Sequence, residues 1–279
     1  MGAHVFVAGG LSAVGLPYAR RIGAEAIQVF VSNPRGWAPS AGDARADEAF
    51  RASCAEAKMP VFVHAPYLIN FGSPTETTRE RSAASVQHSL ARGRRIGARG
   101  VVVHAGSAVD EGQHDVALKV MRELVLPVLD SLGADDPTLL IEPTAGGGKP
   151  LAATVEDLEP LFAALDHHPR LGVCLDTCHA FAAGHDLATP GGVRRTLNRL
   201  VRIVGRGRLQ LIHANDSKDP VGSGRDRHAN IGAGMIGTEP FGELFRHPAT
   251  RGVPVVIETA GDVETHSRDL ATLRSLRDR

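Results

Sequence analysis

The stretch that decides the fold is Leu209–His228, which reads LQLIHANDSKDPVGSGRDRH. It opens as an apolar strand that ends on His213, and a polar loop follows that carries Asp226 and His228. Barrels and doubly wound sheets build their sites in this way, because buried parallel strands deliver side chains into loops at their carboxyl ends. His and Asp are ordinary zinc ligands. Taken alone, the stretch is equally compatible with a surface loop that holds two histidines and an aspartate.

Short apolar runs alternate with longer stretches of helical pattern along the whole chain, which is typical of βαβ units. The predicted strands are His4–Ala8, Ala26–Phe30, Val61–His64, Gly100–His104, Thr138–Glu142, Leu171–Asp176, Leu209–His213 and Pro254–Glu258. The predicted helices are Pro17–Gly23, Ala44–Ala57, Thr75–Ile96, His114–Leu132, Thr154–Asp166, Gly191–Val204, Glu239–Phe245 and Val263–Arg277. Eight such units favour a (β/α)8 TIM barrel over an open sheet. We see no linker or repeat, so we expect residues 1–279 to form one domain.

The composition is that of a soluble enzyme. Apolar residues make up 43% of the chain, enough for a sizeable core. The longest apolar runs are strand-length, well below the roughly 20 residues that a membrane span needs. The N-terminus lacks the pattern of a signal peptide, and three cysteines are too few for a disulfide framework. We therefore expect a cytoplasmic protein without a membrane partner.

Six of the eight predicted strands end in a residue that can bind a metal ion. These residues are His64, His104, Glu142, Asp176, His213 and Glu258. In a closed barrel the carboxyl ends of the strands meet at one face, so these side chains should converge. A single one could cap a helix or lie in the core, but six together indicate a metal centre. The loop residues His179, Asp226 and His228 raise the number of candidate ligands to nine, which suits three ions better than one.

The segment Gly172–His179, which reads GVCLDTCH, holds two cysteines as well as two candidate ligands. By spacing alone, Cys174 and Cys178 are further candidates for zinc. Cys174 shares its strand face with Asp176, however, which favours a buried and inert thiol.

The same segment closely resembles a signature of the endonuclease IV family of abasic-site DNA endonucleases. Three further motifs resemble that family: His64–Asn70 (HAPYLIN), Ile141–Gly146 (IEPTAG) and the polar loop from His213 to His228. The resemblance covers nearly the whole chain in the family's order, from the Gly9-Gly10 turn to Glu258-Thr259. It implies a TIM barrel with a trinuclear zinc site, where manganese is an alternative at one position.

The resemblance also implies a role for each candidate ligand. The implied sets are His64, His104 and Glu142 for the first ion, Glu142, Asp176, His213 and Glu258 for the second, and His179, Asp226 and His228 for the third. Glu142 and Glu258 are the implied catalytic residues. A hydroxide held between two ions would supply a nucleophile at neutral pH, while the ions neutralise the phosphoryl oxygens.

The implied substrate is damaged double-stranded DNA. Members of the family hydrolyse the phosphodiester 5′ to an abasic site, leaving a 3′-hydroxyl and a 5′-deoxyribose phosphate, and they clean blocked 3′ ends. The DNA-probing residues of the family match Arg35, Tyr67 and Leu68. We expect a monomer that works at the nucleoid.

A net charge of zero argues at first against a nucleic-acid partner. The sequence charge omits bound metals, however, and three divalent ions would make the loaded protein positive. Lys218, Arg225 and Arg227 are then candidates to contact phosphates, although each could equally be a solvated surface charge.

The sequence departs from the family pattern at a few neighbours of the ligands. Pro143 stands where the family often has Asn, which puts a supporting hydrogen bond in doubt. Ala65-Pro66 and Ala105 also replace more usual neighbours of the two histidines, but no ligand is lost.

Two alternatives stay open, one a different enzyme and one a non-catalytic protein. A sugar isomerase or epimerase on a related barrel would use one or two metals and would have no use for His179, Asp226 and His228. A barrel that only binds damaged DNA would keep the fold without turnover.

Overall fold

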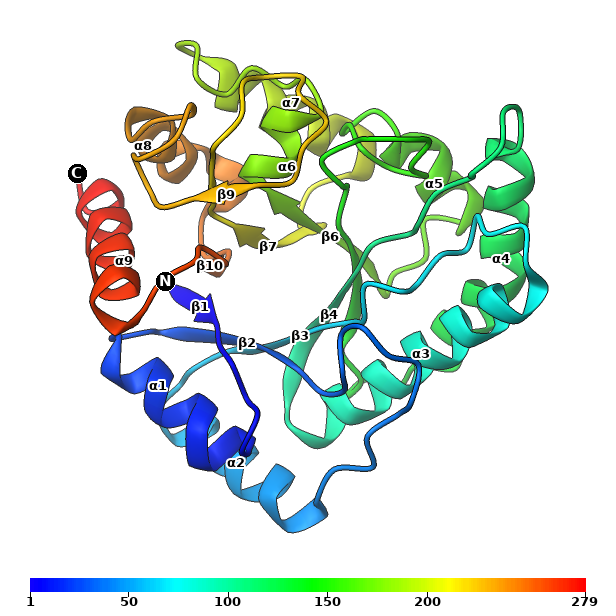
Figure 1. Ribbon diagram of the computed structural model, residues 1–279, viewed down its shortest axis with the longest axis horizontal. Helices are drawn as coiled ribbons and strands as arrows, with labels where there is room; N and C mark the ends of the chain where they lie inside the picture. Colours follow the sequence, from blue (N-terminus) through cyan, green and yellow to red (C-terminus); the bar gives the residue numbers. More distant parts are fainter.

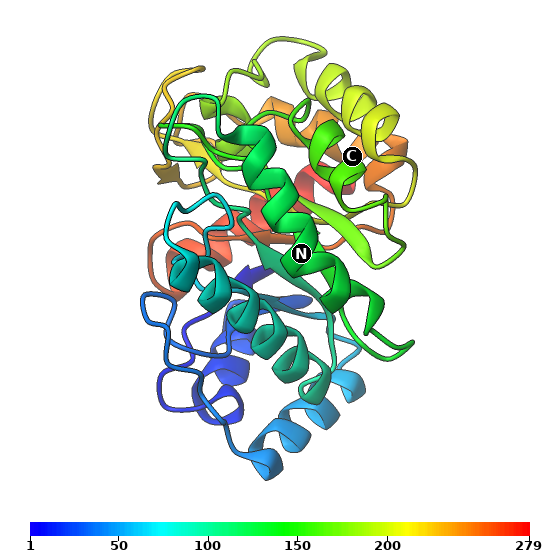
Figure 2. The ribbon, with the colours of Figure 1, turned by 90° about the vertical axis from the view of Figure 1, so that its right-hand side faces the viewer.

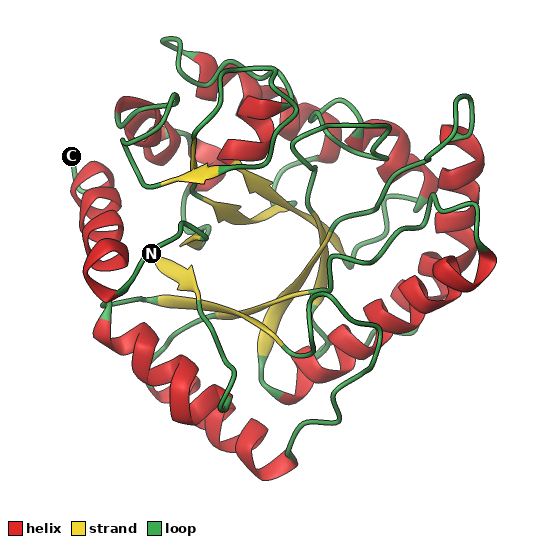
Figure 3. Ribbon diagram, viewed as in Figure 1, coloured by secondary structure: helices red, strands yellow, loops and turns green.

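Eight of the apolar runs form a closed parallel barrel in the computed structural model, which describes all 279 residues (Figures 1 and 3). The barrel strands are β1 (Gly2–His4), β2 (Ala26–Phe30), β3 (Val61–His64), β4 (Ala98–Val103), β5 (Thr138–Ile141), β6 (Leu171–Asp176), β7 (Leu209–His213) and β10 (Val255–Ile257). Each strand pairs with its neighbours in chain order, and β10 closes the ring on β1. The predicted (β/α)8 barrel is therefore confirmed.

Helices surround this barrel on the outside (Figure 3). They are α1 (Leu16–Arg21), α2 (Ala44–Glu56), α3 (Glu76–Arg95), α4 (His114–Asp130), α5 (Leu158–Ala164), α6 (Thr177–Ala182), α7 (Gly192–Val204), α8 (Glu239–Arg246) and α9 (Val263–Arg277), with a π-helical turn at Leu11–Gly15 and a 3-10 turn at Pro248–Thr250. Figure 2 shows α3 and α4 side by side on the outer face. None of the helices combines the length and the apolarity needed to cross a membrane.

Successive side chains along each strand point alternately to the helices outside the barrel and to the barrel interior, and both regions are apolar. Those that point outward join the helices in a large core, which includes Val63, Val103 and Ile141. Those that point inward form a small layer that fills the barrel. This layer consists of Ala26, Phe62, Val102, Leu140, Cys174, Leu211 and Val256, one residue from each of seven strands.

The first predicted strand, His4–Ala8, was placed too late in the chain. The structure has β1 at Gly2–His4, where a Cβ at Gly2 would collide with the carbonyl oxygen of Ala26, so glycine allows the close pairing with β2. The chain leaves the sheet after Val5, and Phe6 is 75% exposed.

Two other predictions need correction. The predicted helix Thr154–Asp166 begins only at Leu158, because the Asp157 carboxylate accepts hydrogen bonds from the backbone N–H groups of Ala153 and Thr154 and holds them in a turn. The helix α6 and a short antiparallel ladder of β8 (Asp216–Ser217) with β9 (His228–Ala229) were not predicted at all. Both elements carry candidate ligands.

Candidate metal centre

Each barrel strand contributes one polar side chain to a ring at the mouth of the barrel. On seven strands this residue lies two positions after a member of the inward-facing layer, as His64 follows Phe62 and Glu142 follows Leu140. Because the side-chain period of a strand is two, the polar residue points to the same interior, one layer higher. The ring consists of His4, Gln28, His64, His104, Glu142, Asp176, His213 and Glu258.

The nine predicted ligands come together in three groups. Within each group the ligand atoms all lie within 4.8 Å of one another. These groups are His64, His104 and Glu142; Glu142, Asp176, His213 and Glu258; and His179, Asp226 and His228. Glu142 joins the first two, since Oε2 lies 3.2 Å from His64 Nε2 and Oε1 lies 2.8 Å from His213 Nδ1. The structure thus brings together the same three sets that the family resemblance implied.

Hydrogen bonds to the backbone orient four of the five histidines among the candidate ligands. His64, His104, His179 and His228 each place Nδ1 near a carbonyl oxygen, at 2.7, 3.1, 3.2 and 3.4 Å. A neutral imidazole that donates from Nδ1 has an unprotonated Nε2, which is the state that binds a metal. In all four residues this Nε2 faces the carboxylates.

The third group offers a direct test of whether a metal ion fits. The Nε2 atoms of His179 and His228 lie 3.2 and 2.9 Å from Asp226 Oδ1, yet neither makes a hydrogen bond, and both are buried. Buried polar atoms are normally paired, so these nitrogens lack a partner that a cation would supply. A set of imidazoles and carboxylates also suits zinc by its chemistry.

Local structure brings His179 and His228 to this group. Asp176 caps α6, because its Oδ1 accepts a hydrogen bond from the His179 N–H at 2.9 Å. His228 pairs with Ser217 in the β8–β9 ladder. The buried Asp216 carboxylate fixes that loop by accepting five backbone N–H groups, those of Ser217, Gly232, Gly234, Ile236 and Gly237.

Opposite charges perturb the acid–base behaviour of the metal-free groups. Burial opposes protonation of His228, but Asp176 and Asp226 outweigh it and raise its pKa to about 9. The same balance raises the pKa of His179 well above its ordinary value. Burial would favour a neutral Glu142, yet the surrounding histidines, led by His213, hold its pKa well below the usual range. The site is therefore built for ionised carboxylates beside cations.

The residues predicted to probe DNA lie beside this centre. Tyr67 is 51% exposed, and its ring packs against Phe30 and His64, with ring centroids 5.4 Å apart in both pairs. Burial and the nearby carboxylates raise the pKa of its hydroxyl to about 12. Its backbone N–H donates to the Pro34 carbonyl oxygen at 2.9 Å, which joins its loop to the one that carries the exposed Arg35. Leu68 beside it is partly buried.

The predicted phosphate contacts lie on the loop around Asp226. Lys218, Arg225 and Arg227 are all exposed. The Arg227 guanidinium donates two hydrogen bonds to Asp219, of 2.7 and 2.5 Å, and Arg225 lies 3.6 Å from the same carboxylate. Lys218 has no such partner, so it is the least constrained of the three.

The two cysteines of the β6 segment are fully buried. Cys174 belongs to the inward-facing layer, and burial raises its pKa to about 12, as it does for Cys178. Each sulfur still lies near ligand atoms: Cys174 beside Glu142 and His213, and Cys178 beside Asp176 and His228. The high pKa values favour the inert thiol that the sequence suggested.

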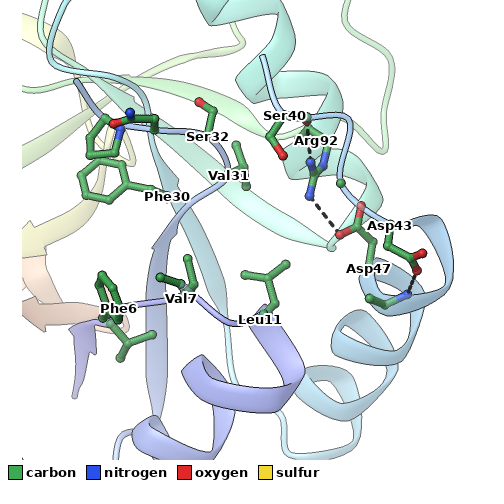
Figure 4. A pocket seen from close by; sticks show the side chains of 17 residues that line it. Phe6, Val7, Leu11, Phe30, Val31, Ser32, Ser40, Asp43, Asp47 and Arg92 are labelled. Carbon is green, nitrogen blue, oxygen red and sulfur yellow. Dashed lines mark hydrogen bonds and ion pairs between the residues drawn. The ribbon is translucent and has the colours of Figure 1, made fainter. Parts of the chain in front are cut away.

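A cavity of about 560 Å³ lies between the loops after β1 and β2 (Figure 4). Phe6, Val7 and Leu11 line one side of it. At its other end Arg92 donates hydrogen bonds to the Ser40 carbonyl oxygen at 2.7 Å and to Asp47 at 3.0 Å. This buried contact anchors the far end of the loop that carries Arg35.

Three residues that support the ligands were missed from the sequence. Gln28 and His4 complete the ring, and Asn215 donates to Asp176 Oδ2 at 2.7 Å while accepting from the Glu258 N–H at 2.8 Å. Gln28 carried a signal, since it is the polar residue within the apolar run AIQVF. His4 was missed because the prediction made it the first residue of its strand, whereas in the structure it is the last residue of β1.

Known proteins with similar sequences indicate the family of this chain. A family model described as a xylose isomerase-like TIM barrel matches residues 16–277. The protein named probable endonuclease 4 from Streptomyces coelicolor is 61% identical over 279 residues, which cover all of this chain and 95% of that protein. A protein of the same name from Methanoculleus marisnigri is 37% identical and is covered to 98%.

Solved structures are similar to this chain over nearly its whole length. The crystal structure of endonuclease IV from Thermus thermophilus matches with a TM-score of 0.86 and 34% identity, covering 99% of this chain and 98% of that one. A D-tagatose 3-epimerase-like protein matches with a TM-score of 0.74 at 17% identity, over 100% of this chain and 97% of that one. At that identity the second match concerns the fold alone.

Proposed function

The chain belongs to the endonuclease IV family, and from that premise we propose that it is a metal-dependent DNA-repair endonuclease. In this proposal it hydrolyses the phosphodiester 5′ to abasic sites in duplex DNA, leaving a 3′-hydroxyl and a 5′-deoxyribose phosphate. It also cleans blocked 3′ ends.

The observation that carries the proposal is the third ligand group. His179, Asp226 and His228 converge beside the two groups that share Glu142. A sugar isomerase or epimerase that works with one or two metals has no use for this set, whereas three ions suit a trinuclear phosphodiesterase. The similarity to an epimerase-like barrel supports only a shared fold.

We infer that the three groups hold three divalent ions, zinc in the first place, with manganese as an alternative at one position. When bound, such ions lower the pKa of water to about 7 and neutralise phosphoryl oxygens. Glu142 is placed to serve two groups at once, and Glu258 Oε2 lies 3.2 Å from His213 Nδ1 in the second group. These two carboxylates are therefore the proposed catalytic residues.

The chain's own residues would position the DNA around this centre. Tyr67 and Arg35 lie on neighbouring loops joined by a backbone hydrogen bond, and with Leu68 they form the proposed wedge. Apolar or planar side chains inserted into a duplex are a usual means of keeping it bent. Lys218, Arg225 and Arg227 would contact flanking phosphates, and such contacts fix the orientation of the duplex without reading its sequence.

The experiment that tests the proposal uses a labelled duplex with one abasic analogue. The purified protein should cut it once, 5′ to the lesion, and should spare the intact duplex. A chelator should abolish cleavage, and added zinc should restore it. Turnover on ketose sugars without any DNA cleavage would favour the isomerase alternative, and binding of the lesion without cleavage would favour the non-catalytic one.

A further inference from the structure

The side chain of Gln28 is fully buried and contacts three other members of the ring. Its Oε1 lies 2.9 Å from His213 Nε2, and its Nε2 donates to Glu258 Oε1 at 2.7 Å. His4 Nδ1 lies 2.9 Å from both Gln28 Nε2 and Glu258 Oε1, which closes a triangle of contacts. Gln28 thus joins two predicted ligands, and both ends of its amide are occupied by these contacts.

The orientation of the amide follows from its neighbours. A carboxylate can only accept hydrogen bonds, so Glu258 must face the NH₂ of Gln28 and not its oxygen. The amide oxygen then faces His213, where it can only accept, so the His213 Nε2 must carry the proton. Nδ1 of His213 is then the nitrogen left to bind a metal ion, and it faces Glu142 at 2.8 Å and Glu258 at 3.2 Å.

His213 is therefore turned the opposite way to the other four histidines among the candidate ligands. Those four place Nδ1 on a backbone carbonyl and present Nε2 to the carboxylates, whereas His213 presents Nδ1. No backbone carbonyl holds its outer nitrogen, and Gln28 takes that place. The same amide holds Glu258 Oε1, while Oε2 stays beside His213.

We propose that Gln28 is a positioning residue that fixes the tautomer of His213 and the carboxylate of Glu258, and so sets the metal affinity of the second group. The inference rests on the proposed metal centre. Residues that support metal ligands in this way change affinity by about 10- to 100-fold when they are removed. The first and third groups do not touch Gln28, so their affinities should stay close to those of the wild type.

Two variants and one control test the inference. Gln28→Met removes the donor and the acceptor at similar volume, and Gln28→Ala does so without any risk of overpacking. Gln210→Met is the control, because Gln210 lies three residues before His213 on β7, packs near Gly172 and makes none of these contacts. Urea unfolding of each metal-free protein shows whether it folds.

Zinc is the probe, titrated into the full chain against a chromophoric chelator. We expect one of three equivalents to bind about 10- to 100-fold more weakly in both Gln28 variants, and none to change in Gln210→Met. The ¹⁵N signals of His213 in the zinc-loaded wild type should show a protonated Nε2 and a metal-bound Nδ1, and Gln28→Met should lose this pattern. A purely structural role would not alter that pattern.

Wild-type affinity for every equivalent together with an unchanged His213 spectrum, in whichever Gln28 variant folds, would overturn the inference. Because both readouts use zinc without DNA, they are independent of the proposed reaction. A wild type that binds three zinc ions but leaves abasic DNA intact would overturn the proposed function, while the effect of Gln28 on zinc would still stand.

Discussion

Among single residues, Glu142 has the most demanding position, because its two oxygens serve two ligand groups from one fully buried side chain. Glu142→Gln keeps the shape but removes the charge that both groups share. We expect cleavage of abasic DNA to fall by more than about 100-fold, the upper limit for residues that only support a ligand. Single-turnover rates at saturating zinc measure this. Glu159→Gln, an exposed change at the start of α5, is the matched control and should leave the rate unchanged.

Tyr67 and Arg35 lead to a different expectation, because they lie beside the metal centre and not in it. Tyr67→Ala and Arg35→Ala should retain all metal ions. Binding of an abasic duplex should weaken by about 1–3 kcal/mol, the range for a side chain that stacks on a base. A duplex that is already frayed at the lesion should be affected less, since the wedge is then not needed.

Gel-shift and cleavage measurements on both duplexes check this expectation, with the exposed Arg45→Ala as the control. Equal losses on the two duplexes would place Tyr67 and Arg35 within the catalytic machinery. No loss on either would show that they have no part in recognition.

At the scale of elements, much of the barrel could be predicted, because each strand carries its own signal. β6 and β7 lie where they were expected, since an apolar run that stops at Asp176 or His213 marks a strand end clearly. β1 was misplaced because Phe6 to Ala8 continue the apolar run of the strand but lie outside the sheet. His4 was missed because the bounds of its strand were wrong. The bounds of β2 were right, but Gln28 lies inside that strand and not at its end, where the candidate ligands were sought.

The helix α6 and the β8–β9 ladder could not be predicted for another reason. Both are short, and they depend on long-range contacts more than on local pattern. The carboxylate of Asp216 holds its loop through backbone groups up to 21 residues away, which no local periodicity reveals. The ligand residues were found nevertheless, because their types and the family resemblance did not depend on these elements.

The loop that carries Arg35 is anchored at its far end by the buried Arg92, which joins α3 to the loop and to α2. Arg92→Met leaves Asp47 buried with only the half-exposed Arg95 as its partner. Breaking a buried pair in this way costs about 3 kcal/mol or more, so the free energy of unfolding should fall by about that amount.

Urea denaturation measures this change. The control is Arg94→Met on the same helix, because Arg94 is exposed and lies 3.7 Å from its partner Asp136. Such surface pairs contribute less than about 1 kcal/mol. Equal effects of the two changes would show that Arg92 is not an anchor. The Arg92 variant should also raise KM for abasic DNA more than it lowers kcat, since the metal centre itself is intact.

For the whole molecule, the neutral sequence and the charged site together predict that zinc binding is coupled to protons. The pKa of His228 is about 9 in the metal-free site, so this imidazole is protonated at pH 7, and zinc must displace that proton. Affinity should therefore fall as the pH falls, and protons should be released on binding. Calorimetry in buffers of different ionisation enthalpy measures the release. A heat that is independent of the buffer near pH 7 would show that His228 does not bind the metal.

We propose that three metal ions at one barrel mouth make this chain an abasic-site endonuclease. The most direct test follows the cleavage rate of a single-lesion duplex while zinc is added back to chelated protein, with the bound metal counted in each sample. We predict that full activity develops only as the third equivalent binds per chain. A rate that is already maximal at one equivalent, or cleavage that persists without bound metal, would contradict the proposed three-metal mechanism.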